Sequence, residues 1–471
     1  MKRKATRYLA FVALLAGCTT VGRDYSVPVD AIIRKPSALQ EFQEMHNPAV
    51  RNAELPRQWW RLYSDPMLDE LITRALQANT DLRVAAANVK RAEASLEMTK
   101  EKTLPKTELM AAPSYTRLSA EEYLLPGAPL PAEYLYGVEG SLSYQLDLFG
   151  EVTRAIHASR ANTAASRAAY DRVKVDIIAE TTRTYLEICS TNHEIEIITA
   201  LDSLQHQLTT LQGVLVRAGR GTSTDMKRLK VQEAHTHAAL PLWRARQKAA
   251  LYRMAAFIGK TPAELPHNIE ARHSIPSIDR PLPTGDGGSM IQRRPDIRQA
   301  EEELKAATAG IGVATASLYP HISLGVSGGS VGLAENFLRN DTFKFSIGPL
   351  ISWEFPNRSH AKTRIKGAEA ETEAAYARFD GSVLNALREV ETALTVYAHD
   401  LDRNRELRHA EAETDRVEQD TEKLFKGGKA NIITKLEARK ALLQISLDRA
   451  ESDAKVLEDQ VQLFHALGGG W

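Results

Sequence analysis

The chain has 471 residues, enough for more than one ordinary domain, and its 60 Lys and Arg residues balance 60 Asp and Glu residues. The zero net charge creates no overall field that would favour nucleic acid or an anionic lipid surface. Mean hydropathy is −0.32, and no apolar run beyond the N-terminus is long enough for a membrane-spanning helix.

The first residues have the pattern of a secretory signal peptide. Basic residues at positions 2–7 precede a short apolar stretch that is too short to span a bilayer. The stretch ends in Leu15-Ala16-Gly17-Cys18, which resembles a bacterial lipobox, where the cysteine thiol receives a diacylglycerol. We therefore expect residues 1–17 to be removed and Cys18 to be acylated. By resemblance to sorted lipoproteins, Thr19 permits transport to the outer membrane. The alternative is an ordinary signal peptide with a chance cysteine.

A helix is predicted after Asp65-Pro66, because Asp can cap a helix and Pro suits its first turn. Its counterpart in the second half of the chain is expected to begin near Arg294-Pro295-Asp296. The other cysteine, Cys189, lies in a strongly helical stretch, and we predict a buried core residue rather than a nucleophile.

Apolar and polar residues alternate at 134–149 and again at 343–355, which is typical of strands with one apolar face. Weaker partner strands are predicted at about 107–118 and 321–331. The strands are long enough to cross a bilayer and carry many aromatics, as lipid-facing strands do. The alternative is that these strands form a pair of hairpins packed on a soluble core. Because four strands cannot close a barrel and open edges cannot sit in lipid, membrane insertion would require several chains to contribute strands.

Two proline-free stretches, at about 151–216 and 357–425, predict helices far longer than those of globular domains and favour coiled-coil packing. Each ends in a glycine-bearing turn, Gly219-Arg220-Gly221 or Gly427-Gly428, after which a second helix returns. Each half of the chain is thus expected to hold a long helical hairpin.

The two halves repeat each other. Asp81-Leu82-Arg83 matches Asp296-Ile297-Arg298 at an offset of 215, and Gly219 matches Gly428 at an offset of 209. This period is too long for a solenoid and indicates a duplicated module. We predict a lipidated segment at 18–64, a first module at 65–270 and a second module at 271–471.

Five motifs, in this order and with the duplication, resemble the TolC-like outer membrane factor family, in its lipoprotein (NodT/OprM-like) branch of RND-type tripartite efflux systems. They are Gly22-Arg23-Asp24-Tyr25 with Pro28, Trp59-Trp60, Leu146-Asp147-Leu148-Phe149-Gly150, Arg293-Arg294-Pro295-Asp296-Ile297, and Ala466-Leu467-Gly468-Gly469-Gly470-Trp471. The resemblance covers nearly the whole mature chain. Arg23 stands where the family usually has proline.

The resemblance implies a mainly α fold with transmembrane β-strands. Long hairpins would form a periplasmic α-barrel, and four strands per chain would contribute to a trimeric, twelve-stranded outer-membrane β-barrel. It also implies a lipid-anchored exit duct that passively exports small molecules. The partners implied are two other copies of the chain, outer-membrane lipid, a periplasmic adaptor and an inner-membrane RND-type pump.

The family's periplasmic gate falls on three positions: the apolar one on Ile433, the acidic one on Glu437 and the basic one on Lys440. At the acidic position the family commonly has Asp, and the side chain of Glu437 is longer than that of Asp. Adaptor docking falls on the hairpin tips at Gly219, Gly221, Gly427 and Gly428. Without the resemblance, the charges at 435–440 are typical of a solvated helix face.

No phosphate-binding loop, catalytic triad or metal-ligand spacing occurs in the sequence. We therefore expect no enzyme activity, no cofactor, no metal site and no nucleic-acid partner. Two alternatives remain at this point: a duct of the same fold for type I protein secretion, and a periplasmic coiled-coil scaffold without a barrel. The exported substrate is not indicated.

Overall fold

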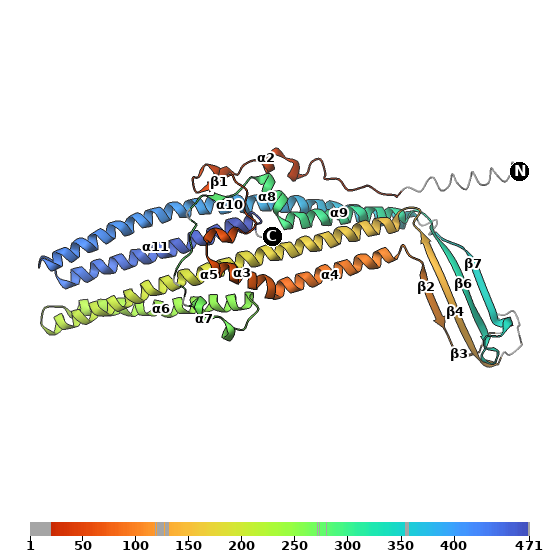
Figure 1. Ribbon diagram of the computed structural model, residues 1–471, viewed down its shortest axis with the longest axis horizontal. Coiled ribbons are helices and arrows are strands. Elements are labelled where there is room, and N and C mark those ends of the chain that lie inside the picture. The colour runs from red at the N-terminus through yellow and green to blue at the C-terminus, as the bar shows by residue number, and fades with distance from the viewer. Residues whose placement is uncertain are drawn as a thin grey trace. The chain divides into compact units, whose positions relative to one another are not determined.

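A computed structural model describes residues 20–117, 119, 127, 131–270, 272, 274–278, 280–353 and 358–469. Each half of the chain runs through short helices, then strands, then a pair of long helices, in the same order (Figure 1). The longer elements are α3 (Pro66–Ala78), α4 (Thr80–Glu101), β2 (Lys106–Ala111), β3 (Ser114–Arg117), β4 (Ala132–Leu146), α5 (Glu151–Arg217), α6 (Ser223–Phe257), α8 (Gly287–Arg293), α9 (Pro295–Ala316), β6 (His321–Leu333), β7 (Phe343–Ser352), α10 (Arg358–Lys426) and α11 (Ile432–Ala466).

Short elements fill the connections. They are η1 (Ile32–Arg34), α2 (Pro36–Leu39), η2 (Gln43–His46), β1 (Val50–Arg51), η3 (Trp59–Tyr63), η4 (Pro262–Glu264), α7 (His267–Glu270), β5 (Leu282–Pro283), η5 (Ala334–Asn336) and η6 (Asn340–Thr342). Among the described residues, no helix is both long and apolar enough to cross a lipid bilayer.

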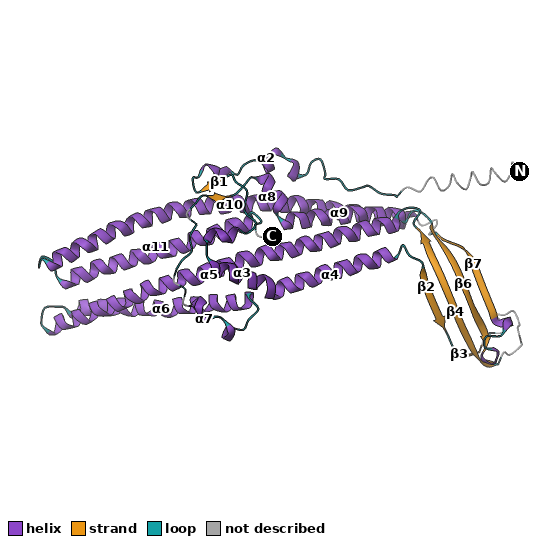
Figure 2. Ribbon diagram, viewed as in Figure 1, coloured by secondary structure: helices purple, strands orange, loops and turns teal. Residues whose placement is uncertain are grey.

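The chain divides into two compact units, of which the first contains residues 1–27, 88–166 and 299–379. Its main feature is an antiparallel sheet in the order β2-β4-β6-β7, with β3 pairing β4 beyond β2 (Figure 2). The strand expected at 107–118 is thus two strands, which are separated by Ala112 and Pro113. Proline cannot donate a ladder hydrogen bond, so it interrupts the strand.

The register aligns the two faces of the sheet in rows. Leu142, Val326 and Ile347 lie opposite one another in an apolar row, and Ser141, Ser327 and Ser346 form the next, polar row. Farther along the polar face, Lys344 Nζ lies 2.5 Å from Glu139 Oε2. On the apolar face, Ile347 is 75% exposed, so the described part of the chain leaves this face uncovered.

One tyrosine on the apolar face was not foreseen as a polar anchor. Tyr136 is buried, and its hydroxyl lies 2.6 Å from Ser330 Oγ and accepts a hydrogen bond from Leu338 N at 2.8 Å. The ring of Phe337 packs against its ring at an interplanar angle of 60°, with 4.7 Å between the centroids. Tyr136 therefore fixes the connection between β6 and β7.

The second unit contains residues 28–87, 167–298 and 380–471 and holds the hairpins. α5 and α10 have 67 and 69 residues, which corresponds to about 100 Å of helix each. In the part of this unit that is described, α6 returns along α5, and α11 returns along α10 (Figure 1). Polar side chains join each pair: Gln205 Nε2 donates to Leu229 O at 3.3 Å, and Asn404 Nδ2 donates to Asp453 Oδ1 at 2.8 Å.

Asp65 caps α3, as the sequence predicts, and also binds at a distance. Its Oδ1 accepts from Met67 N at 2.8 Å, while its Oδ2 accepts from Tyr185 Oη at 2.8 Å and pairs with Arg272 at 3.0 Å. Cys189, one turn from Tyr185, is fully buried, as predicted. Burial raises the pKa of its thiol to about 12, so it is a packing residue rather than a nucleophile.

The duplication is visible in element lengths. α4 and α9 both have 22 residues and begin 215 positions apart, at 80 and 295, while α6 and α11 both have 35 and begin 209 apart, at 223 and 432. The prediction that the counterpart of α3 begins near Arg294-Pro295-Asp296 is therefore wrong. That position begins α9, the counterpart of α4, and α8 precedes α9 as α3 precedes α4.

Candidate functional site at the hairpin tips

The turn of the first hairpin is closed by backbone hydrogen bonds around Gly219. After α5, Gly219 has a φ of +70°, and Arg220 N donates to Leu215 O at 2.9 Å. This left-handed residue after a helix is the usual glycine stop. Thr222 then caps α6 by accepting from Asp225 N at 3.1 Å. A Cβ at Gly221 would lie 2.9 Å from Gln212 Nε2, so this glycine permits the chain to pass close to α5.

The second hairpin turns in the same way. Gly428 also has a φ of +70°, and Lys429 N donates to Leu424 O at 2.9 Å. Asn431 caps α11, since its Oδ1 accepts from Thr434 N at 2.9 Å. Gly427 precedes the left-handed position and meets only ordinary contacts. The structure thus places all four predicted glycines in the two turns.

The three predicted gate residues lie on one face of α11. Ile433, Glu437 and Lys440 are spaced at four and three residues, which aligns them along the first turns of the helix. Glu437 is exposed, and Ile433 and Lys440 are partly exposed. Lys440 Nζ donates to Gln232 Oε1 of α6 at 3.0 Å, so this face also touches the first hairpin.

Burial lowers the pKa of the Lys440 ammonium, while the Glu437 carboxylate acts in the opposite direction. Glu437 forms no ion pair with any other residue that the structure describes.

The other charges of this run have partners inside the hairpin. Lys435 Nζ lies 2.7 Å from Glu422 Oε2 and 5.0 Å from the centre of the Phe425 ring, and Arg439 Nη1 lies 3.7 Å from Glu418 Oε1. The hydrogen bond from Lys435 holds the pKa of Glu422 below its ordinary value. The alternative that these charges have no gate role thus fits Lys435 and Arg439, because both tie α11 to α10. It fits Glu437 less well, because Glu437 has no such partner among the described residues.

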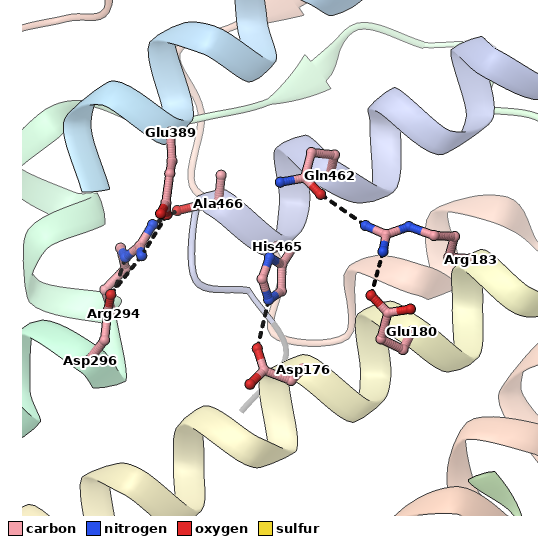
Figure 3. Close-up of polar contacts among 9 residues, drawn as sticks. All are labelled: Asp176, Glu180, Arg183, Arg294, Asp296, Glu389, Gln462, His465 and Ala466. Carbon is pink, nitrogen blue, oxygen red and sulfur yellow. Dashed lines mark hydrogen bonds and ion pairs between the residues drawn. The ribbon is translucent and has the colours of Figure 1, made fainter. Parts of the chain in front are cut away.

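A second polar group holds the far end of α11 (Figure 3). The largely buried Arg294 guanidinium donates to Asp296 at 2.6 and 2.9 Å, to Ala466 O at 2.8 Å, and pairs with Glu389 at 2.8 Å. These partners stand on α9, α11 and α10. The arginine of the Arg-Pro-Asp motif is therefore the residue that joins three helices of the second module.

Two further contacts join α11 to α5 of the first module. His465 Nε2 lies 2.7 Å from Asp176 Oδ1, and Arg183 binds both Gln462 Oε1, at 2.8 Å, and Glu180 (Figure 3). The sequence showed Arg294 and Asp296 as a motif but gave no signal for Glu389, Asp176 or His465. Asp176 and His465 are 289 residues apart in the sequence, and Glu389 is also far from Arg294. No local spacing therefore reveals these contacts.

Several predicted features fall outside the described residues: the signal peptide at 1–17, Cys18, residues 354–355 of the last predicted strand, and Trp471. In the described part of the chain, no group of three or more His, Cys, Asp or Glu residues is arranged to hold a metal ion. His237 Nδ1 instead lies 3.3 Å from Asp202 Oδ2.

Curated proteins of similar sequence span nearly the whole chain. The pyoverdine export outer membrane protein OpmQ of Pseudomonas putida is 28% identical over 435 residues, covering 90% of this chain and 91% of that protein. The solvent efflux pump outer membrane protein SrpC of Pseudomonas putida is 26% identical, covering 100% of this chain and 99% of that protein.

Solved structures agree on the fold. The outer-membrane channel OprN superposes with a TM-score of 0.84 and 28% identity, covering 96% of this chain and all of the other. The CmeC outer membrane channel of Campylobacter jejuni superposes with a TM-score of 0.83 at 17% identity, covering 96% and 95%. The family model "outer membrane efflux protein" matches residues 71–260 and 288–469. The chain belongs to the outer membrane efflux protein family and is an efflux channel of the outer membrane.

Proposed function

We propose that three copies of this chain assemble into one duct, through which an inner-membrane RND-type pump, joined by a periplasmic adaptor, expels small molecules. The observation that carries the proposal is the incomplete sheet. Among the described residues, β7 pairs only with β6, and β2 and β3 pair only with β4. Unpaired edges cannot lie in lipid, and about eight strands are the practical minimum for closure. Three copies of this sheet satisfy both requirements.

The two faces of the sheet support a water-filled interior. The row of Leu142, Val326 and Ile347 is apolar and suits lipid, whereas the serine row and the Glu139–Lys344 pair suit water. The duct itself is passive, so the energy comes from the pump. The names of the relatives, which refer to a siderophore and to solvents, support a small-molecule cargo.

Cys18 would anchor each chain, and incorporation of radiolabelled fatty acid checks this acylation.

A deletion strain tests the function. Its susceptibility to antibiotics, detergents, dyes and metal salts is compared with that of strains carrying the intact gene or a gene that lacks residues 321–352. Hypersensitivity that only the intact gene restores supports efflux and identifies the cargo class. An unchanged panel together with loss of a secreted protein would favour the type I secretion duct.

We further propose that Ile433, Glu437 and Lys440 close the periplasmic end, and that the turns at Gly219, Gly221, Gly427 and Gly428 receive the adaptor. Three copies of Glu437 around a common axis would form an acidic ring, which attracts cations. The hydrogen bond from Lys440 to Gln232 supports this proposal, because it links the second hairpin to the first near the tips.

The gate is tested by E437Q/K440Q. Loss of contacts that are worth about 1 kcal/mol should shift the balance between open and closed tips by about fivefold, so single-channel conductance of the purified trimer should rise. E413Q/R416Q is the matched control, since this exposed pair is 2.7 Å apart on α10 and lies outside the predicted gate. Conductance that is unchanged in E437Q/K440Q would remove both residues from the gate.

A further inference from the structure

The segment that follows the expected acylation site is seated on the first unit by a buried arginine. Arg154 of α5 donates to Val21 O at 2.9 Å and to Gly22 O at 2.9 Å, and it pairs with Asp24 at 2.6 Å. Its side chain is only 4% exposed. The segment therefore has a fixed position on α5.

Beside this contact lies a cavity of about 370 Å³. It is lined by residues of three segments: the N-terminal segment, α5 and α9. The charged and titratable ones are Arg23, Asp24, Arg154, His157, Arg160, Glu302 and Lys305. Four permanent cations thus face two carboxylates, so the cavity carries a net positive charge while the whole chain is neutral.

Two of the cations have no internal counter-ion. Asp24 pairs with Arg154, and Lys305 lies 2.8 Å from Glu302 and 3.2 Å from Glu301. Arg23 and Arg160 are exposed and form no ion pair with any residue that the structure describes. A guanidinium fork matches the oxygens of a phosphate, and a pair of such groups at one cavity is typical of an anion site.

The position of the cavity indicates where the anion comes from. Arg23 is five residues from Cys18, which limits their separation to about 18 Å. Arg160 lies nine residues into α5, about 14 Å along that helix from its start, and only residues 147–150 separate α5 from β4. The cavity therefore lies close along the chain to the expected acyl anchor and to the strand ends, where the proposed membrane position would place lipid headgroups.

We propose that this cavity binds the phosphate of an anionic phospholipid in the periplasmic leaflet of the outer membrane, with Arg23 and Arg160 as its principal ligands. The proposal rests on the proposed membrane position of the sheet and anchor. Headgroup binding would fix the N-terminal segment on α5 and set the depth of the channel independently of the acyl chains.

The test measures binding of short-chain lipids to the full-length trimer purified in detergent. The probes are dihexanoyl phosphatidylglycerol, dihexanoyl phosphatidylcholine and inorganic phosphate. Phosphatidylglycerol should bind at least about tenfold more tightly than either of the others, and R23Q/R160Q should lose about tenfold in affinity for it. K90Q/R91Q removes two exposed cations from α4 of the same unit and should bind as the unmodified protein does.

Equal binding of phosphatidylcholine, or full binding by R23Q/R160Q with an unchanged melting temperature, would overturn the proposal. Binding of inorganic phosphate as tight as that of phosphatidylglycerol would also overturn it, since it would indicate a soluble anion. The C18A protein should bind phosphatidylglycerol as tightly as the unmodified protein, and loss of binding in C18A would overturn the claim that the site acts independently of the anchor. Because the assay needs neither export nor a pump, loss of efflux in the deletion strain can be judged separately from loss of lipid binding.

Discussion

Arg294 shows how one buried charge can define the end of a long helix. Its fork binds Asp296 with two nitrogens, while the remaining donors reach Glu389 and the carbonyl of Ala466. A lysine has a single ammonium and cannot reproduce this geometry. The ring contact between Trp59 and Phe464, 4.7 Å apart, lies in the same turn of α11 and depends on the same positioning.

Arg294→Ala should therefore be strongly destabilising, by about 3–5 kcal/mol, because it removes a largely buried guanidinium from Asp296 and from the Ala466 carbonyl, whereas Glu389 still has Arg388 at 3.7 Å. Arg294→Lys should recover only part of this loss. Urea unfolding of the detergent-purified protein measures both. Arg416→Ala, at an exposed pair, should stay within about 0.5 kcal/mol of the unmodified protein, and an equally small effect at Arg294 would contradict the interpretation.

Glu194 should make stability depend on pH. Its side chain is almost fully buried on α5, and this burial raises its pKa to about 7, with Glu451 and Glu187 adding to the shift and Arg246 opposing it. The folded protein thus retains a proton that the unfolded chain has lost above about 4.5. Stability must fall as pH rises from there to about 7 and stay reduced above it.

Glu194→Gln removes the carboxylate and should flatten this dependence. Relative to the unmodified protein, it should gain about 2–3 kcal/mol between about pH 5 and pH 8. Unfolding curves at both pH values measure the change, and Glu413→Gln, on an exposed side chain, is the control. Parallel pH profiles for both variants would show that Glu194 ionises normally.

At the scale of elements, the glycines of the two turns have unequal roles. Gly428 has a φ of +70° in open space, whereas Gly427 has no such backbone requirement. Gly428→Ala should therefore cost about 1 kcal/mol through the left-handed backbone, and Gly427→Ala should cost less. Hydrogen exchange of the α10–α11 turn would show faster opening in Gly428→Ala alone, and equal exchange in both variants would contradict this assignment.

How far the sequence predicts these elements depends on whether their signal is local. Helix periodicity, caps such as Asp65 and turns such as Gly428 are local, so the long hairpins could be predicted nearly to the residue. The 215-residue offset between Asp81-Leu82-Arg83 and Asp296-Ile297-Arg298 already pairs α9 with α4. The counterpart of α3 was missed because the short α8 has no strong pattern of its own. Alternation alone assigns Tyr136 to the apolar face of its strand. Its hydrogen bonds to Ser330 and Leu338 depend on a tertiary contact that alternation does not encode.

The candidate site divides in the same way. The turns and the α11 face that carries Glu437 follow from spacing. The partners of Lys435 and Arg439, by contrast, lie on α10, and only the packed hairpin shows that these cations are already neutralised.

At the scale of the whole molecule, the proposed trimer requires that the two faces of the sheet meet different media. Ile347→Arg puts a charge in the apolar row and should cost about 2–4 kcal/mol if that row lies at the bilayer midplane. Ser346→Arg puts the same charge next to it on the polar face and should be tolerated. The yield of heat-resistant trimer in outer-membrane fractions compares them. Equal loss for both variants would mean that the two faces are not divided between lipid and water.

The contact between Trp59 and Phe464 has a consequence for biogenesis. The two rings are 405 positions apart in a chain that is synthesised from its N-terminus. At about 5–20 residues per second, Trp59 waits roughly 20–80 s before its partner exists. During this interval its binding surface has no partner, so the nascent polypeptide is a natural client for holding chaperones, and slow synthesis would prolong its exposure to proteases.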